Sequence, residues 1–216
     1  MHAAKPGKRE LNRIRNRNAI LDAARACFHM HGYDRVTIRD IIRRTGLAAG
    51  TFYNYFDDKE AIFRSLVTDF VENLNERLHT LRQNADDEQS FVHNTYLALF
   101  ESSARDPIIY ELAHRNEYSI REIFGADIAG LTMESLREDL SEAVDRGLFP
   151  DVDQQYLAAA FFGVACEMAT RVARRASDSE QPHNEVASDA ADFATALFLG
   201  GVQRLQLRNE TMYVSA

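Results

Sequence analysis

The stretch between residues 37 and 59 carries the side chains best suited to chemistry with a polyanion. It reads T-I-R-D-I-I-R-R-T-G-L-A-A-G-T-F-Y-N-Y-F-D-D-K and includes three arginines, one lysine and two tyrosines. Arginine and lysine neutralise phosphates, whereas tyrosine, threonine and asparagine form hydrogen bonds with phosphates or base edges. The small residues Ala48, Ala49 and Gly50 let a backbone approach another surface closely. These residues together indicate recognition of duplex nucleic acid.

Two short helices joined by a tight turn are expected to position these side chains. Thr37 is a suitable N-cap for a helix over residues 38–45, because its hydroxyl can accept from free N–H groups of the first turn. Gly46 is expected to end that helix with a positive φ. A second helix is predicted over residues 49–55, and in a helix-turn-helix the start of the second helix enters the major groove. A hairpin that only packs is the alternative, but it has no need for outward Tyr-Asn-Tyr beside three arginines.

The pattern around this stretch resembles the TetR family of bacterial transcriptional regulators over residues 15–65. The residues that carry the resemblance are I20-L-D-A-A-x-x-x-F28-x-x-x-G32-Y-x-x-V-T37-I-R-D-I41-x-x-x-x-G46-L-A-A-G50-T51-F-Y53-x-Y55-F56-x-D-K59-E60. The resemblance implies that the groups nearest the bases are Arg39, Ala49, Gly50, Thr51 and Tyr55, and that phosphates are held by Thr37, Tyr53 and Lys59.

One residue departs from the family pattern. The family commonly has a serine where this chain has Ala48, so a cap or a phosphate hydrogen bond is lost. Ala49 can offer only van der Waals contact, for instance to a thymine methyl. Sequence readout is therefore expected to depend on Arg39, Asn54 and Tyr55.

Charge is divided unequally along the chain, whose net charge is −8. Residues 1–59 hold 12 Lys/Arg against 6 Asp/Glu, which is +6, and residues 60–216 hold 13 against 27, which is −14. A basic head on an acidic body directs the head toward a polyanion. A solvated charged face is the ordinary explanation of such runs, and the adjoining helix-turn-helix favours DNA instead.

Apolar periodicity predicts an all-α fold of about nine helices, with no strand pattern and no repeat. We expect an N-terminal arm and DNA-binding domain over residues 1–58 and a ligand-binding and dimerisation domain over residues 59–216. The arm, residues 1–12, is expected to be flexible, and either to follow the phosphates, to enter the minor groove or to be a mere tail. Helices are expected over residues 13–31, 38–45, 49–55, 59–81, 89–105, from 107, 127–146, from a cap at Asp153 to 176, and 186–207.

The last two long helices are expected to form the interface of a homodimer, as a four-helix bundle across a two-fold axis. Glycine inside a helix costs about 1 kcal/mol against alanine, and close helix–helix approach is a natural reason for it. An internal core is the alternative. The predicted interface residues are Tyr156, Ala160, Gly163, Phe193, Leu197, Gly200 and Gly201.

By the family resemblance, the body contains a cavity for a small-molecule effector that releases the protein from a palindromic operator. Its aromatic residues suggest an apolar or lipid-like ligand, with ordinary core or surface as the alternative for each. The predicted lining residues are Phe70, Tyr96, Phe100, Ile109, Tyr110, His114, Arg115 and Phe161, and Arg121 is a further candidate to meet an anionic group.

The sequence disfavours catalysis, cofactor binding and metal binding. No nucleophile elbow, phosphate loop, dinucleotide fingerprint or zinc signature occurs, so we expect no enzyme and no cofactor. His114, with Glu111 and Glu117 on either side, is better explained by a solvated face or a binding cavity than by acid–base catalysis. His29 and His31 point about 200° apart on a helix and lack ligand partners, so no metal is expected.

The sequence also predicts where the protein is found and what its role is. Without a secretory signal or an 18-residue apolar run, we expect a cytoplasmic protein with no membrane partner, in which Cys27 and Cys166 are reduced, although a disulfide is possible. The predicted role is a dimeric, ligand-responsive transcriptional regulator, most often a repressor. The alternatives are a ligand-independent DNA-binding architectural or protein-interaction module and an enzyme with an appended DNA-binding head.

Overall fold

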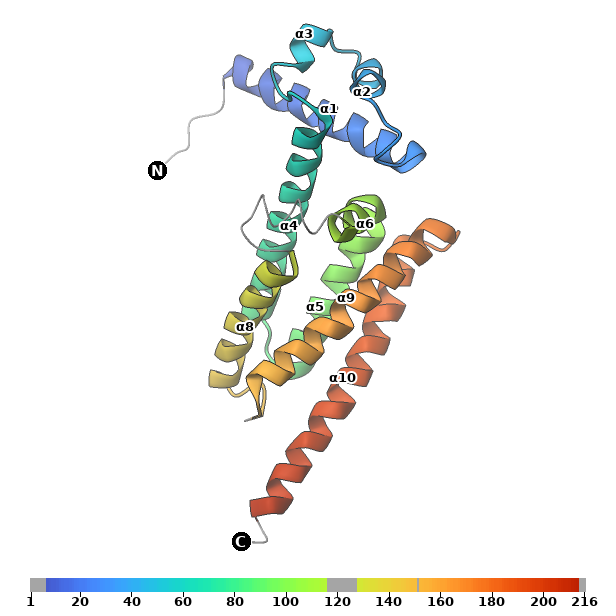
Figure 1. The fold of residues 1–216 in the computed structure, drawn as a ribbon. Coiled ribbons are helices and arrows are strands. Elements are labelled where there is room, and N and C mark those ends of the chain that lie inside the picture. Colours follow the sequence, from blue (N-terminus) through green and yellow to red (C-terminus); the bar gives the residue numbers. More distant parts are fainter. Residues whose placement is uncertain (1–6, 116–127, 151, 214–216) are drawn as a thin grey trace. The chain divides into compact units, whose positions relative to one another are not determined.

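The computed structural model describes residues 7–115, 128–150 and 152–213, with side chains described except at 112–115, 128–132 and 202–213. Over these ranges the chain forms nine helices and no strand (Figure 1), so the predicted all-α class is confirmed. The helices are α1 (Lys8–His31), α2 (Ile38–Thr45), α3 (Ala49–Phe52), α4 (Lys59–Gln83), α5 (Glu88–Arg105), α6 (Pro107–Arg115), α8 (Ile128–Asp145), α9 (Gln154–Asp178) and α10 (His183–Tyr213).

The chain divides into two compact units, Met1–Phe70 and Val71–Ala216. The boundary predicted at residues 58 and 59 is the start of α4, whereas the compact units meet inside that helix. The first turns of α4 belong to the first unit because Ile62, Phe63 and Leu66 are buried there, each at most 2% exposed.

The first unit is built around the buried face of α1. Ile20, Ala24 and Phe28 recur at helical spacing and are fully buried. The ring of Phe28 meets Tyr33 edge-on, with centroids 5.2 Å apart, and Tyr33 in turn lies 5.1 Å from Phe63 of α4. One aromatic chain thus joins α1, the following loop and α4.

Helix α1 begins earlier than the sequence suggested. We predicted a flexible arm to residue 12, but the helix starts at Lys8, with Gly7 in an extended conformation as its N-cap. The first turn is closed by a bond from the Leu11 N–H to the Gly7 carbonyl, 3.0 Å long, and Arg13 pairs with Glu10 at 3.3 Å. Local interactions of this kind carry no apolar period, which explains why the pattern missed them. The remaining arm residues, 1–6, lie outside the described part.

Helix α5 is the centre of the second unit, where it packs against α9, α10 and α6, while α8 and α6 also pack against α9. Its buried aromatic residues stack with those of its neighbours. Tyr96 lies 4.5 Å from Phe161 and 5.7 Å from Phe100, nearly parallel to both, and Phe161 meets Phe198 of α10 edge-on at 5.1 Å. Edge-to-face and offset arrangements of this kind are favourable between aromatic rings.

A buried ion pair also holds the second unit together. Arg82, near the end of α4, and Asp139 of α8 are each 2% exposed, with Arg82 Nη1 3.2 Å from Asp139 Oδ2. The Arg82 Nε–H donates to Thr95 Oγ1 at 3.3 Å, and His79 Nδ1 lies 2.6 Å from Asp139 Oδ1. Burial lowers the pKa of the Arg82 guanidinium, and the Asp139 carboxylate opposes that shift.

Several helix ends in the body differ from those predicted, among them the end of α10 at Tyr213 rather than at residue 207. Helix α4 runs to Gln83 and α9 to Asp178, and α10 starts at His183, immediately after Pro182, rather than at residue 186. Proline suits the position before or at a helix start, and its carbonyl accepts from the N–H groups of Glu185 and Val186. The predicted loop over residues 177–184 is therefore shorter than expected.

Helix α9 is the one described helix that is long and apolar enough to cross a membrane, with a mean hydropathy of 1.3 over its most apolar window. The core helix of a globular domain passes the same test, and α9 packs against four other helices. The composition of α9 is therefore weak evidence for a membrane span.

Candidate nucleic-acid interface

Helix α2 is fixed at both ends by local interactions. The Thr37 side chain accepts from the Asp40 N–H, and the Asp40 carboxylate accepts from the Thr37 N–H at 3.0 Å, which forms a capping box. Gly46, with φ of 68°, ends the helix in the left-handed region as predicted. Ile41 is fully buried between these ends.

The capping box bears on the predicted phosphate contact of Thr37. The Thr37 hydroxyl donates to Asp40 Oδ2 at 2.6 Å, so both Thr37 donors point to one carboxylate. A phosphate oxygen is an acceptor and needs one of these donors. Contact between Thr37 and a phosphate, which stays a prediction, therefore requires that the hydroxyl turn away from Asp40.

Helix α3 is shorter than predicted. It ends at Phe52, not Tyr55, because the N–H groups of Asn54 and Tyr55 bond to the carbonyls of Thr51 and Phe52, three residues back. This tighter turn places Phe52 and Phe56 in the core, at 0% and 7% exposure.

The predicted base-contacting residues of this segment are mostly accessible. Ala49, Gly50 and Asn54 are exposed and Thr51 is half-buried. Ala48 adopts the extended conformation of an N-cap but supplies no side-chain hydrogen bond, as the departure from the family pattern predicted. The buried Phe52 ring anchors α3, whose small residues Ala49 and Gly50 stay exposed.

The two tyrosines of the segment differ in their surroundings. Tyr53 is 51% exposed and meets Phe52 edge-on, which leaves its hydroxyl accessible. Tyr55 is half-buried, and its hydroxyl accepts from Asn16 Nδ2 of α1 at 3.3 Å. Tyr55 therefore also ties the segment to α1, a role that only the tertiary contact reveals.

Lys59 has partners within the protein that the sequence did not indicate. Its Nζ donates to the Tyr33 carbonyl at 2.9 Å and lies 4.3 Å from the centroid of the Tyr33 ring. A lysine in the first turn of a helix is disfavoured by the helix dipole, and this carbonyl and ring offset that cost. Asp58 caps the same helix by accepting from the Ala61 N–H at 2.6 Å.

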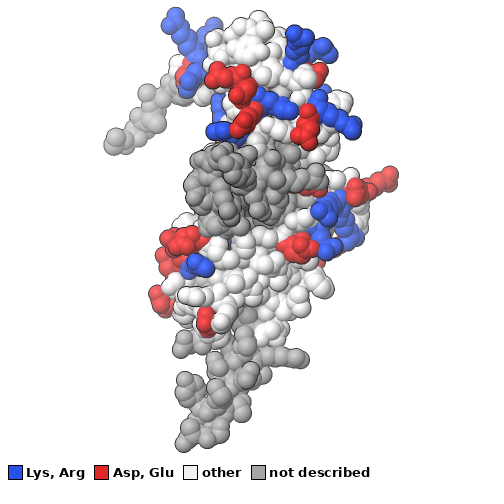
Figure 2. All heavy atoms as spheres, viewed as in Figure 1, with Lys and Arg blue, Asp and Glu red and all other residues white. Residues whose placement is uncertain are grey.

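The arginines of the first unit fall into paired and unpaired groups. Arg17 donates to Ser65 Oγ, lies 3.5 Å from Asp69 and 6.0 Å from the Phe56 ring, so it joins α1 to α4. Arg39 is exposed and forms no ion pair within the described residues. Figure 2 shows basic side chains spread over the first unit, with acidic ones between them. Arg39 is therefore available for an outside anion or base.

Residues 20–66 match the profile of the family described as bacterial regulatory proteins, tetR family. This match confirms the resemblance to the TetR family over these residues. The HTH-type transcriptional repressor AcnR of Corynebacterium efficiens is 40% identical over 53 residues, which are 24% of this chain and 28% of AcnR. The sequence likeness to this relative thus spans under a third of its length.

Solved structures of bacterial regulators match over most of the chain. The fatty acid degradation regulator FadR of Bacillus halodurans has a TM-score of 0.68 at 20% identity, and the match covers 89% of this chain and 97% of FadR. FadR of Bacillus subtilis, solved in complex with stearoyl-CoA, has a TM-score of 0.65 at 20% identity and covers 82% and 97% of the two chains. At this identity the likeness establishes the fold.

Most of the predicted ligand residues are buried. Tyr96, Phe100, Ile109, Tyr110 and Phe161 belong to the core of the second unit, each at most 5% exposed. The hydroxyls of both tyrosines donate to carbonyls of α9, at 3.4 Å each, and burial raises the pKa of both phenols.

The other predicted ligand residues are placed differently. Phe70 is half-buried at the end of the first unit. The side chains of His114 and Arg115, in α6, lie outside the described part, as does residue Arg121. The structure thus gathers five of the eight predicted residues into one core and leaves their role as a prediction.

The predicted interface residues are exposed in the single chain. Tyr156, Phe193 and Leu197 are 78%, 61% and 59% exposed, although large apolar side chains favour burial. The remaining members are also exposed: Ala160, Gly163, Gly200 and Gly201.

The remaining sequence-based expectations concern thiols and metals. Cys27 and Cys166 are free, and burial raises the pKa of both thiols, that of Cys166 to about 12. Among the described residues no group of three or more His, Cys, Asp and Glu side chains is arranged to hold a metal ion.

Proposed function

We propose that this chain is a dimeric, sequence-specific DNA-binding transcriptional regulator. It acts in the cytoplasm as a repressor on a palindromic operator. The observation that carries the proposal is the helix-turn-helix of α2 and α3, whose short second helix is anchored by Phe52 and presents Ala49 and Gly50 outward. In such motifs the start of the second helix contacts base edges in the major groove.

Base and phosphate contacts are assigned to different residues in this proposal. Arg39, Ala49, Gly50, Thr51, Asn54 and Tyr55 form the base-reading set, and Thr37, Tyr53 and Lys59 the phosphate-binding set. The exposed, unpaired guanidinium of Arg39 suits bidentate binding to guanine. Lys59 keeps two further ammonium hydrogens after its bond to the Tyr33 carbonyl, so the same residue can also donate to a phosphate.

Selection of bound duplexes from a random DNA pool tests the proposal directly. A two-fold symmetric motif is expected, with half-sites separated by one helical turn of roughly 34–36 Å or a multiple of it. Enrichment of no motif, with duplex binding retained, would favour a ligand-independent architectural role instead.

Two substitutions separate the predicted roles. Tyr53→Phe removes one hydroxyl and is expected to weaken binding to every duplex similarly. Arg39→Ala is expected to relax specificity at one base pair, by roughly 1–3 kcal/mol. A salt-titrated binding assay on the selected motif and on a random duplex compares the two. A silent Tyr53→Phe would remove its phosphate role.

Dimerisation is proposed from the exposed apolar face of α9 and α10. Tyr156, Phe193 and Leu197 leave apolar surface in contact with water, and contiguous surface of this kind marks interaction sites. The glycines of this face, Gly163 and Gly200 among them, have no atom within 4 Å of an added Cβ, so the backbone there is open to close approach.

A charge placed on that face tests the dimer. Phe193→Glu is expected to produce monomers in sedimentation equilibrium, because a carboxylate would be desolvated at the interface. Phe193→Leu keeps the position apolar and serves as the control, with dimers expected. Monomeric wild-type protein at micromolar concentration would refute the interface.

The effector is proposed to be a small apolar or lipid-like molecule bound by the second unit. The support is the aromatic composition of that core together with the stearoyl-CoA held by FadR of Bacillus subtilis, which shares the fold. A ligand that prefers a state unsuited to DNA lowers operator affinity by its differential affinity for the two states.

Stearoyl-CoA is the first probe to test, with free CoA as the control. The expected result is release of the selected duplex by stearoyl-CoA and no release by CoA. Palmitate is tested separately as a second lipid-like probe. An operator affinity that neither stearoyl-CoA nor palmitate changes would argue against a lipid-like effector.

A further inference from the structure

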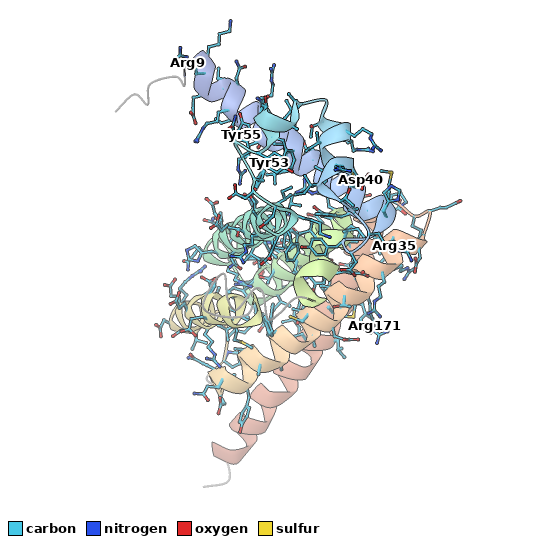
Figure 3. The ribbon with its side chains drawn as sticks, turned by 45° about the horizontal axis from the view of Figure 1, so that its top comes forward. Arg9, Arg35, Asp40, Tyr53, Tyr55 and Arg171 are labelled. Atoms are coloured by element: carbon cyan, nitrogen blue, oxygen red, sulfur yellow. The ribbon has the colours of Figure 1, made fainter. Side chains whose placement is uncertain are left out.

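The first unit contains a basic hollow that the proposed function does not use. It lies between the end of α1, the loop before α2 and one flank of α2, and it has a volume of about 550 Å³ open to solvent. Three arginines line it, Arg35, Arg43 and Arg44, with one carboxylate, Asp40. Figure 3 shows Arg35 and Asp40 near the end of α1 that lies opposite Arg9.

The carboxylate in this hollow is already engaged. Asp40 accepts from the N–H and the hydroxyl of Thr37, and Arg43 Nη1 lies 3.9 Å from its Oδ1. The hydrogen bonds from Thr37 lower the pKa of Asp40, so it is ionised at neutral pH. Its negative charge is thus directed mainly into the cap of α2.

The other two arginines have no such partner. Arg35 and Arg44 are exposed and form no ion pair within the described part of the chain. Three arginines less one carboxylate leave the hollow with a charge of +2, counting His31 as neutral. Like charges held in one concavity attract an anion, and guanidinium groups suit bidentate binding of phosphate oxygens.

We propose that this hollow is a second anion site, which binds a phosphate group through Arg35 and Arg44. The phosphate belongs either to the backbone of a duplex, outside the contacts of α3, or to a free phosphorylated molecule. Binding of a duplex phosphate rests on the proposed function, whereas binding of a free phosphorylated molecule does not.

Charge-removing variants test the site in two assays. Arg35→Gln, Arg44→Gln and the double variant are compared with Arg171→Gln, which removes an exposed arginine of α9 that pairs with Glu167 at 2.8 Å. Arg171 is labelled in Figure 3. Salt-titrated binding is measured on the selected duplex and on a random one. Pyrophosphate is titrated into the DNA-free protein by calorimetry.

For a duplex phosphate, the double variant is expected to weaken both duplexes alike by roughly tenfold and to reduce the salt slope by about 1–2. For a free phosphate, wild-type protein binds pyrophosphate saturably and the double variant does not. Arg35→Lys with Arg44→Lys keeps the charge and is expected to restore part of either signal.

The outcomes decide between these sources. A double variant that equals Arg171→Gln in both assays, with an unchanged melting temperature, would overturn the proposal. Should wild-type protein bind no duplex at all, the proposed function fails, and the pyrophosphate titration alone decides this site.

Discussion

Breaking the buried ion pair between Arg82 and Asp139 is expected to destabilise the second unit strongly. Asp139→Asn keeps the shape of the side chain but leaves a guanidinium at 2% exposure without its counter-ion. Removal of one partner of a buried pair costs about 3–5 kcal/mol, because the remaining charge stays desolvated. Thr95 still accepts from the Arg82 Nε–H, at 3.3 Å, which places the expected cost near the lower bound, about 3 kcal/mol.

Replacement of both partners is expected to cost far less. In Arg82→Met with Asp139→Leu no buried charge remains, and apolar side chains of similar volume fill the space, so the double variant is expected within about 1–2 kcal/mol of wild type. Asp139→Asn is therefore expected to cost about 1–2 kcal/mol more than the double variant.

Urea unfolding followed by circular dichroism measures these changes, with unchanged m-values as the condition for comparing them. Arg137→Met is the control, since Arg137 is an exposed residue of α8 that pairs with Glu134 at 3.7 Å, and exposed pairs contribute about 0–1 kcal/mol. A cost of Asp139→Asn no larger than that of the control would refute the inference that the pair is desolvated.

Three further outcomes are expected. Gly46→Ala should destabilise the first unit by about 1–2 kcal/mol in thermal melts, because φ is 68° there, whereas Gly50→Ala, at an ordinary φ with open space around it, should be neutral or stabilising. Thr37→Ala should cost about 1 kcal/mol by loss of the cap, and an unchanged melting temperature would contradict the capping box. Burial raises the pKa of Cys166 to about 12, so its contribution to stability is complete below the ordinary thiol pKa and is lost as pH rises above it; urea unfolding between pH 8 and 10 should show a falling free energy, less steep in Cys166→Ser.

The sequence by itself determined the local frame of the first unit. Thr37, Gly46 and the apolar spacing of α2 act within a few residues of one another, so cap, helix and turn followed from the pattern. The excess of basic residues before residue 60 is likewise a property of the chain and needs no fold. The family resemblance over this region is also confirmed by the match at residues 20–66.

Only the tertiary structure decided which donors remain available for a partner. Lys59 meets the Tyr33 carbonyl and ring, and Tyr55 meets Asn16, across separations of 26 and 39 residues that no local pattern encodes. Arg17 joins α1 to α4 through Ser65 and Asp69, which lie 48 and 52 residues away in the sequence.

In the second unit, too, the sequence pattern does not tell which apolar residues are buried. Periodicity places Phe161 and Phe193 on apolar helices alike, yet one is 1% exposed and the other 61%. A helix with apolar residues around much of its circumference does not specify which side meets its own chain. That choice, like the burial of Arg82 against Asp139, is made by the packing of α5, α8, α9 and α10, because burial depends on neighbours that come from distant parts of the sequence.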